Sequence, residues 1–386
     1  MPIRKLQSDK IFDGDIFLAD HVLVAEMDGT IIDLIPAAKA GEDLEQFTGI
    51  LCPGFINCHC HLELSYLKGK IQSGTGLIPF LQNVIQQREE RLIDRHDSII
   101  EAEKELWNNG VQGVGDICNT PDTIATKMKS RIRWHNWIEV INLNDEQALD
   151  IIKKYKITGK EYGQDNMVHL LTPHAPYSVS KKTFKELNRL TAGKMISIHN
   201  QESHAENELF QKGTGHFLAL YHSLGRNVSP HGVSGRTSLQ TWLPYFTAGQ
   251  TILLVHNTFT IEEDIVFASA HAEKYDLKII YCFCPNANLY IEDGLPPISL
   301  FITNNCTIVL GTDSYGSNKQ LSMLSEIQTI QKYFPMISVE TILKWATANG
   351  AAAFRWNDLG IFEKGARPGV INLFESDSGL TVQRII

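Results

Sequence analysis

Eight short apolar runs, each followed by polar residues, constrain the fold of this 386-residue chain more than any other feature of its sequence. Most are apolar over about four to six consecutive residues, as parallel strands buried on both faces are. We therefore expect eight buried strands. The runs are Gly54–His61, Val111–Asn119, Arg131–Asn142, Met167–Pro176, Lys194–Glu202, Thr251–Phe259, Lys278–Tyr290 and Cys306–Ser314.

Segments with helical spacing of apolar residues separate these runs. A strand–helix alternation that repeats eight times predicts an α/β protein built as a (β/α)8 barrel of the TIM type. Such barrels take roughly 250 residues before insertions, and the span from 54 to 350 leaves room for large connections. The clearest helical segments are Ile78–Arg91, Ser98–Asn109, Lys181–Leu190, Ile261–Tyr275 and Leu321–Tyr333, with a further stretch near Ser338–Phe354.

The segment 203–250 is long for a connection between a strand and a helix. Such a loop at the carboxyl-terminal face of a barrel is either a lid over the active site or a surface excursion without function, and both interpretations stay open. The ends of the chain differ from its middle. Residues 11–50 and 365–386 have the turn signals of small antiparallel strands.

Charge and composition exclude several classes of protein. The net charge of −9 gives no reason to expect a nucleic-acid partner. No apolar run reaches the ~20 residues of a membrane span, and the N-terminus lacks the apolar segment of a signal peptide. We therefore expect a cytoplasmic protein without a membrane partner. The seven cysteines lie mostly in apolar runs, which predicts reduced thiols and no disulfide framework.

Side chains that bind metals or transfer protons follow nearly every run. Barrel enzymes carry their active sites at the carboxyl-terminal ends of the strands, so we expect these side chains to meet. Packing alone does not explain why so many of them occur there. The set consists of His59, His61, Asp116, His174, His199, Glu202, His256, Asn286, Asn288 and Asp313.

A metal site is the first expectation from this set. His59 and His61 lie two residues apart on one strand and share a face, whereas Cys60 points away. Together with His199 and Asp313 they suit one divalent metal, Zn²⁺ most readily and Fe²⁺ as the alternative. The fourth run ends without a lysine or glutamate that could bridge a second metal. A bound metal would lower the pKa of water, so that hydroxide is available to attack the substrate at neutral pH.

Glu202, His256 and Asp313 are the expected catalytic side chains. Glu202 follows the fifth strand and would protonate a substrate nitrogen, although a glutamate in such a loop can also cap a helix. His256 would orient the attacking water or stabilise an oxyanion, and the alternative is a core histidine. Asp313 would accept a proton from that water in addition to binding the metal.

His174, Glu63 and Asn288 are the expected substrate-binding residues. A structural role is an equal alternative for Glu63 and for Asp116. Flat substrates could stack on tryptophan, but core packing explains these rings better. The tryptophans considered are Trp107, Trp134 and Trp137.

Taken together, the motifs resemble those of the amidohydrolase superfamily, and most closely its branch of mononuclear deaminases and triazine hydrolases. This resemblance implies zinc or iron at the four ligands above, proton transfer to the substrate ring by Glu202, and contact between His256 and the reacting centre. It covers nearly the whole chain. The motifs are Pro53–His61, His174–Ser178, His199–Glu202, Val255–His256 and Gly311–Ser314.

The same resemblance implies a domain arrangement. Residues 1–52 and 355–386 would form one small β-sandwich, and residues 53–354 would form the metal-dependent hydrolase barrel. The run His61-Leu62-Glu63-Leu64-Ser65 is similar to that of aminodeoxyfutalosine deaminases. The chain departs from the family at Ala287, where members often carry serine.

The resulting hypothesis is an aminohydrolase that releases ammonia from a heteroaromatic ring, such as that of aminodeoxyfutalosine, adenosine or S-adenosylhomocysteine. The alternatives are hydrolysis of another C–N or C–Cl bond, as in guanine, cyclic amides, imidazolones or chlorotriazines, and a metal-binding protein without catalysis. Glu202 favours the first, because protonation of a ring nitrogen suits heteroaromatic amines. The expected partner is a small heteroaromatic molecule, with a homodimer left open.

Overall fold

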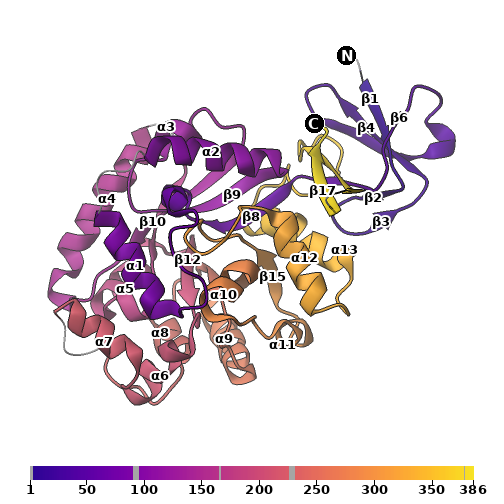
Figure 1. Ribbon diagram of the computed structural model, residues 1–386. Coiled ribbons are helices and arrows are strands. Elements are labelled where there is room, and N and C mark those ends of the chain that lie inside the picture. The colour runs from indigo at the N-terminus through magenta and orange to yellow at the C-terminus, as the bar shows by residue number, and fades with distance from the viewer. Residues whose placement is uncertain (1–2, 90–94, 165–166, 226–230, 378) are drawn as a thin grey trace.

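The chain folds into alternating strands and helices with a smaller group of strands at one side, as Figure 1 shows for the computed structural model. The structure describes residues 3–89, 95–164, 167–225, 231–377 and 379–386. In this part of the chain no helix is long and apolar enough to cross a membrane.

Two four-stranded parallel sheets form the centre of the larger part, and their eight strands coincide in order with the eight apolar runs. The first sheet has the order β11-β10-β9-β8 and the second the order β12-β13-β14-β15. The strands are β8 (Phe55–Cys60), β9 (Val111–Cys118), β10 (Arg133–Val140), β11 (His169–Pro173), β12 (Met195–Asn200), β13 (Thr251–His256), β14 (Lys278–Phe283) and β15 (Thr307–Leu310).

Hydrogen bonds connect the two sheets at both of their edges. At the β8–β15 edge, the backbone nitrogens of Thr312 and Asp313 both donate to the carbonyl of His59 at 3.0 Å. At the β11–β12 edge, the backbone nitrogen of His199 donates to the carbonyl of His174 at 3.0 Å. Because all the pairings within the sheets are parallel, the carboxyl-terminal strand ends lie on one side. The predicted α/β class is confirmed.

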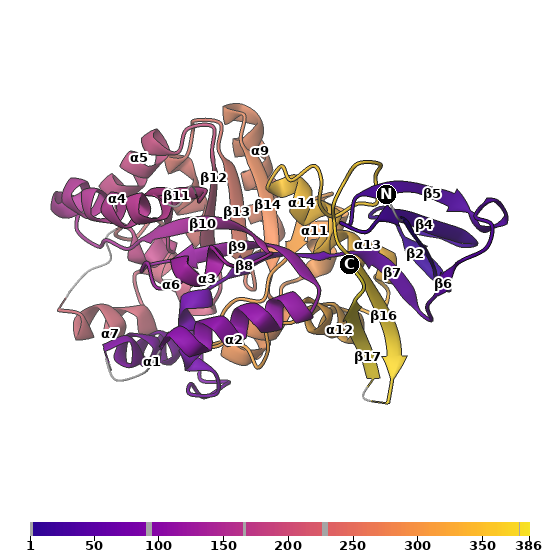
Figure 2. The same cartoon turned by 90° about the horizontal axis from the view of Figure 1, so that it is seen from above.

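Helices follow most of the strands and cover the sheets (Figure 2). Every helix predicted from spacing is present in the described residues, and Lys181–Leu190 is reproduced in full. The predicted end of the first helix, Arg91, lies outside the described residues, and the stretch 338–354 is divided into two helices. The helices are α1 (Leu77–Glu89), α2 (Arg95–Asn108), α3 (Ile124–Lys127), α4 (Ala148–Gln164), α5 (Lys181–Leu190), α9 (Glu262–Tyr275), α10 (Pro285–Glu292), α11 (Ile298–Thr303), α12 (Met323–Tyr333), α13 (Val339–Ala346) and α14 (Ala348–Ala353).

The connection 203–250, expected as a long loop, is largely helical where the structure describes it. It contains α6 (His204–Lys212), α7 (His216–Ser223) and α8 (Ser238–Trp242). Serine or threonine side chains begin α6 and α8 by accepting a hydrogen bond from a backbone N–H of the first turn, as N-caps do. Helix α7 packs against α1, which brings two distant segments together.

The two ends of the chain share one sheet (Figure 2). Strand β16 pairs with β7 in antiparallel fashion, with Ile371 opposite Cys52. The sheet has the order β17-β16-β7-β2-β3, and a second one has the order β5-β4-β1-β6. The strands are β1 (Ile3–Gln7), β2 (Lys10–Phe12), β3 (Phe17–Leu18), β4 (His21–Glu26), β5 (Ile31–Pro36), β6 (Glu45–Gln46), β7 (Ile50–Pro53), β16 (Val370–Ser376) and β17 (Gly379–Arg384).

A buried ion pair supports the carboxyl-terminal end of β8. The Lys127 ammonium donates to the Asp116 carboxylate at 2.5 Å and to the Asn136 side-chain oxygen at 2.7 Å, and the side chains of the pair are fully buried. The other Asp116 oxygen accepts from the backbone nitrogen of Leu62 at 2.8 Å. Asp116 therefore fixes the chain directly after His61.

Replacing Lys127 with methionine leaves the buried Asp116 carboxylate without its cation. Because an unpaired buried charge is costly, we expect the free energy of unfolding to fall by about 3–5 kcal/mol. Lys153→Met is the matched control, since Lys153 and its partner Asp150 are exposed and such pairs contribute about 0.3–0.5 kcal/mol. Urea denaturation measures both, and equal losses would contradict the supporting role.

The buried side chain of His135 should make the free energy of unfolding depend on pH. Its ring lies against Trp137 and Phe354, and burial lowers its pKa to about 4. The unfolded chain, with a histidine pKa near ~6.5, binds the proton more readily, so stability is lost as the pH falls from about 6.5 to about 4. Between about pH 7.5 and pH 5 the linkage amounts to ~2 kcal/mol.

His135→Phe removes this titration and keeps an aromatic ring at the site. The drop in unfolding free energy between the two pH values should therefore be smaller in the variant than in the wild type by that amount. Chemical denaturation at each pH measures the difference. An identical drop in both proteins would show that His135 is not held neutral by the fold.

Candidate active site

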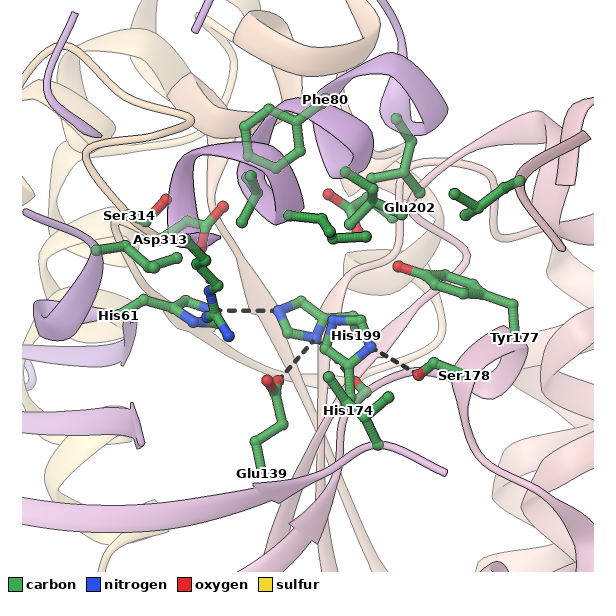
Figure 3. Close-up of a pocket in the computed structure, with 18 of the residues that line it drawn as sticks. His61, Phe80, Glu139, His174, Tyr177, Ser178, His199, Glu202, Asp313 and Ser314 are labelled. Atoms are coloured by element: carbon green, nitrogen blue, oxygen red, sulfur yellow. Dashed lines mark hydrogen bonds and ion pairs between the residues drawn. The ribbon is translucent and has the colours of Figure 1, made fainter. Parts of the chain in front are cut away.

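A cavity lies over the carboxyl-terminal strand ends, and most of the predicted site residues meet there (Figure 3). Its floor is polar and comes from the ends of the strands, whereas its opposite wall is apolar and comes largely from α1 and α7. The predicted residues that line it are His61, His174, His199, Glu202, His256 and Asp313.

Three histidines and one aspartate converge at the cavity floor. The Nε2 atom of His61 lies 3.2 Å from Nε2 of His59 and 3.3 Å from Nε2 of His199. One oxygen of Asp313 lies 3.5 Å from Nε2 of His59 and 3.4 Å from Nε2 of His61. All four side chains are buried. The four residues expected from sequence as metal ligands are thus brought together.

The donor set fits a metal better than it fits a hydrogen-bonded cluster. Nδ1 of His199 lies 2.8 Å from the backbone carbonyl of His174, which requires the proton on Nδ1 and leaves the Nε2 lone pair facing its neighbours. Burial lowers the pKa of His61 and of His199 well below the usual range, so both rings are neutral. Four ligands at ~2.05 Å around one ion are about 3.3 Å apart in a tetrahedron, close to the distances found here.

Asp313 is held as a carboxylate by its surroundings. Its second oxygen accepts a hydrogen bond from the Ser317 hydroxyl at 2.5 Å. Burial alone would raise its pKa, but the hydrogen bond from His59 and the fields of His61 and His256 bring the pKa well below the usual range. The backbone at Asp313 is left-handed, with φ at +57°. Such strain, which surrounding structure must hold, is common at functional sites.

Glu202 and His256 face each other beside this cluster. A Glu202 oxygen lies 3.6 Å from Nε2 of His256, and Nδ1 of His256 lies 2.7 Å from the side-chain oxygen of Asn288. The Asn288 oxygen requires the proton on Nδ1, so Nε2 can accept one. Burial raises the pKa of Glu202 well above its usual range, and the charges of Asp313 and Glu206 raise it further. Burial lowers the pKa of His256 to about 4. Burial therefore favours the protonated form of Glu202.

Glu139 and Arg88 line the same cavity and were missed in the sequence. Glu139 lies near the carboxyl-terminal end of strand β10. Its carboxyl oxygen is 3.8 Å from Nδ1 of His199, and burial raises the pKa of Glu139 to about 7. Arg88 on α1 donates to the side-chain oxygen of Asn119 at 3.0 Å and to Glu63 at 3.2 Å. A charged residue inside an otherwise apolar run was the available signal for Glu139, whereas Arg88 belongs to an ordinary helix.

The remaining predicted residues are not among the described residues that line the cavity. Glu63 accepts hydrogen bonds from the backbone nitrogens of Asn119 and Thr120, and Asn288 contacts His256. Asn286 lies in α10 and bonds to Glu326, and Asp116 supports the backbone as described above. Of the tryptophans, Trp137 is fully buried, Trp134 faces Lys127 and Trp107 packs on Arg384.

Comparison with known proteins explains this arrangement. The model of the amidohydrolase family matches residues 50–377, which is most of the chain and includes every residue of the cluster. The chain belongs to the amidohydrolase family. It is therefore an enzyme, a hydrolase that acts on C–N bonds.

Individual relatives have low sequence identity to this chain, but the similarity covers most of its length. The chain is 25% identical to a 5-methylthioadenosine/S-adenosylhomocysteine deaminase of Thermococcus kodakarensis, over 85% of this chain and 74% of the relative. It is 26% identical to an aminodeoxyfutalosine deaminase of Nitratiruptor sp., over 76% of this chain and 71% of that relative. The crystal structure of Helicobacter pylori aminofutalosine deaminase in complex with methylthio-coformycin superposes with a TM-score of 0.83 at 20% identity, over 97% of this chain and 93% of that chain.

His61→Ala removes one donor from the convergent set. We expect the metal content of the purified protein to fall clearly below one ion per chain, because the variant keeps only three of the four donors and binds the ion more weakly. Elemental analysis measures this. His222→Ala, an exposed histidine on α7, is the control and should keep the full metal content. A His61→Ala protein that retains its metal would contradict the proposed ligand set.

Proposed function

We propose that this amidohydrolase removes the amino group of an adenine-type nucleoside by hydrolysis and releases ammonia. The observation that carries the proposal is the buried carboxyl group of Glu202, which lies 3.6 Å from Nε2 of His256 beside a cluster of metal-type ligands. Burial raises the pKa of this carboxyl group, which favours its acid form. A carboxylic acid that remains neutral at physiological pH can donate its proton to a ring nitrogen. The names of the relatives, which are nucleoside deaminases, support the same reaction.

The proposed cofactor is one divalent metal held by His59, His61, His199 and Asp313. Three neutral imidazoles and a carboxylate suit Zn²⁺, with Fe²⁺ as the alternative. Such an ion, when bound, makes a water acidic enough to ionise near neutral pH and polarises the carbon under attack. The end of β11 presents His174 and no lysine or carboxylate, which favours a single ion.

The chain's own residues account for the movement of protons. Glu202 donates its proton to the ring nitrogen next to the carbon that bears the amine, and this makes that carbon more electrophilic. Asp313, a carboxylate, accepts one proton from the attacking water and passes it to the departing amine, so that ammonia leaves. The remaining hydroxyl proton passes to Glu202, which forms the carbonyl of the product and restores the acid. His256 stays neutral and holds the water by accepting from it. Asn288 fixes the His256 tautomer for this task and is a positioning residue.

Substrate contacts follow from the same geometry. We propose that His174, at the rim of the polar floor, binds a polar substituent of the substrate, because Nδ1 is taken by the Ser178 hydroxyl at 2.6 Å and Nε2 is left for a ligand. Glu63 acts through Arg88 and the backbone of residues 119 and 120, and we assign it a positioning role.

We further propose the finer architecture implied by the family. The two parallel sheets close into a (β/α)8 barrel of residues 53–354, and residues 1–52 and 355–386 form a separate β-sandwich domain. The pairing of β7 with β16 in one sheet supports the proposed β-sandwich domain. A cytoplasmic location fits the seven unpaired cysteines. Homodimer formation stays a prediction that light scattering would test.

Glu202→Gln keeps the shape of the side chain and removes its acid function. We expect kcat/KM for the best nucleoside to fall by about 10²–10⁴, the usual contribution of general acid catalysis, with metal content unchanged. Glu208→Gln is the control, because Glu208 lies on α6 away from the cavity floor. Ammonia release under steady-state conditions measures both variants. Wild-type activity in the Glu202→Gln variant would contradict the proposal that Glu202 is the general acid.

An ammonia-release screen separates the proposal from its alternatives. It should include adenosine, aminodeoxyfutalosine, 5-methylthioadenosine, S-adenosylhomocysteine and guanine. Cyclic amides and a chlorotriazine are assayed in parallel by chromatography of their products, because their hydrolysis releases no ammonia. We expect turnover of at least one adenine nucleoside. Turnover of only the amides or the triazine would replace the deaminase proposal, and a metal-loaded protein without any activity would favour a binding role.

A further inference from the structure

We infer that Glu326 is a positioning residue for the reacting centre, because it connects the helix that fixes His256 to the turn that carries Asp313. The inference rests on the proposed function for the roles of these two side chains. It adds a residue that is not among the described residues lining the cavity. The observation that leads to it is Asn286, which follows a strand as the site residues do but bonds to Glu326 instead.

Glu326 is the meeting point of two segments of the chain. It lies in the first turn of α12 and is fully buried where α12 packs against α10 (Figure 1). One carboxylate oxygen accepts a hydrogen bond from the backbone nitrogen of Asn286 at 2.9 Å. The other accepts from the side-chain nitrogens of Asn286 at 3.0 Å and of Asn318 at 2.8 Å. The donors thus come from both sides of β15 in the sequence.

The first connection reaches His256 through α10. The N-cap residue of this helix, Cys284, offers no side-chain hydrogen bond to the first turn. Glu326 performs this task from another helix, because the nitrogen of Asn286 is one of the N–H groups that a helix leaves unpaired at its start. A carboxylate also suits the positive end of the helix dipole. The turn held in this way carries Asn288, whose side-chain oxygen lies 2.7 Å from Nδ1 of His256.

The second connection reaches Asp313 through Asn318. The side-chain nitrogen of Asn318 donates to Glu326 and also to the backbone carbonyl of Thr312 at 2.9 Å. Thr312 directly precedes Asp313, whose left-handed backbone persists only where the surrounding structure holds it. Ser317, the neighbour of Asn318, donates to the Asp313 carboxylate. The turn that carries Asp313 is therefore fixed to α12.

The choice of a carboxylate at this place favours positioning over packing. The hydrogen bonds to Glu326 come from amide groups and not from a cation, so its burial costs free energy that an apolar side chain of the same size would not cost. A carboxylate offers two acceptor oxygens in one rigid group, whereas glutamine offers one. Only the carboxylate can therefore accept from both connections at once, and this fixes His256 relative to Asp313.

Glu326→Gln keeps the size of the side chain and removes one acceptor oxygen. For the metal-loaded variant we expect kcat for ammonia release to fall by about 10–100-fold, the usual effect of losing a partner that orients a ligand or catalytic group. KM should stay within about threefold, because no contact with the substrate changes. Leu187→Ala, which removes a buried side chain of α5 outside both connections, is the control for lost stability and should keep the wild-type kcat.

A double-mutant cycle separates positioning from a general loss of stability. If Glu326 acts through Asn288, the variant that combines Glu326→Gln with Asn288→Ala should lose little more kcat than the more impaired single variant. The effects of Glu326→Gln and Leu187→Ala should instead multiply. Thermal unfolding shows that each variant is folded.

The affinity for Zn²⁺, measured by competition with a chelator, tests the second connection without any substrate. It should fall by about tenfold in Glu326→Gln and in Asn318→Ala, because both changes release the turn that carries Asp313. Leu187→Ala should keep the wild-type affinity.

The outcomes distinguish this inference from the proposed function. Wild-type kcat in folded Glu326→Gln overturns the inference and leaves the deaminase intact. Effects that multiply with Asn288→Ala, or an unchanged Zn²⁺ affinity in Glu326→Gln, also overturn it, because Glu326 would then support only the packing of α12 against α10. If the wild-type enzyme releases no ammonia from any adenine nucleoside, the proposed function fails, and the Zn²⁺ competition still decides whether Glu326 holds the turn of Asp313.

Discussion

The close approach of three imidazole nitrogens and one carboxylate oxygen, all out of contact with water, is the constraint on which the rest of this structure depends. Lone pairs held 3.2–3.5 Å apart repel one another unless a proton or a cation lies between them. The proposed metal would relieve the repulsion among all four donors at once. The fold holds these donors close together, and much of the surrounding structure performs that task.

That rigidity comes from a second layer of buried polar contacts and from strained backbone. Asp116, paired with Lys127, holds the chain after His61, and the backbone carbonyl of His174 orients the His199 ring. Left-handed φ angles occur at Gln201, His256 and Asp313, where three strands end and the chain turns toward its next helix. Each such residue costs on the order of 1–3 kcal/mol. The buried and paired strands on either side offset that cost.

The sequence predicted the elements whose signal is local. Eight buried strands appear as eight apolar runs because both faces of each strand are covered, and Ser180 marks the start of α5 by capping it. The histidines that we propose as ligands were singled out in the sequence because His59, His61 and His199 follow such runs. Helix α4 was not among the segments recognised, since apolar residues such as Leu149 and Ile157 lie exposed on it and blur its spacing.

Residues that act through distant partners could not be predicted. In the sequence Lys127 looks like an ordinary helical lysine. Only the fold shows that β9 and β10 place Asp116 and Asn136 against its ammonium group. The wall of the cavity depends on the packing of α1 against α7, two helices that lie far apart along the chain. Asn288 stays a predicted substrate contact, but its link to His256 was not foreseen, because it depends on α10 beginning at Pro285 and placing the side-chain oxygen against Nδ1 of His256.

The hydrogen bond between Asn57 and Thr312 joins positions 255 apart in the chain, at the edge where the first and last parallel strands meet. His59 and His61 lie on one side of this seam and Asp313 on the other. During synthesis the histidines of β8 leave the ribosome long before their carboxylate exists. A metal bound by the proposed ligand set would therefore find an incomplete site until nearly the whole larger part has emerged. Its binding would then report on the closure of the first parallel strand against the last.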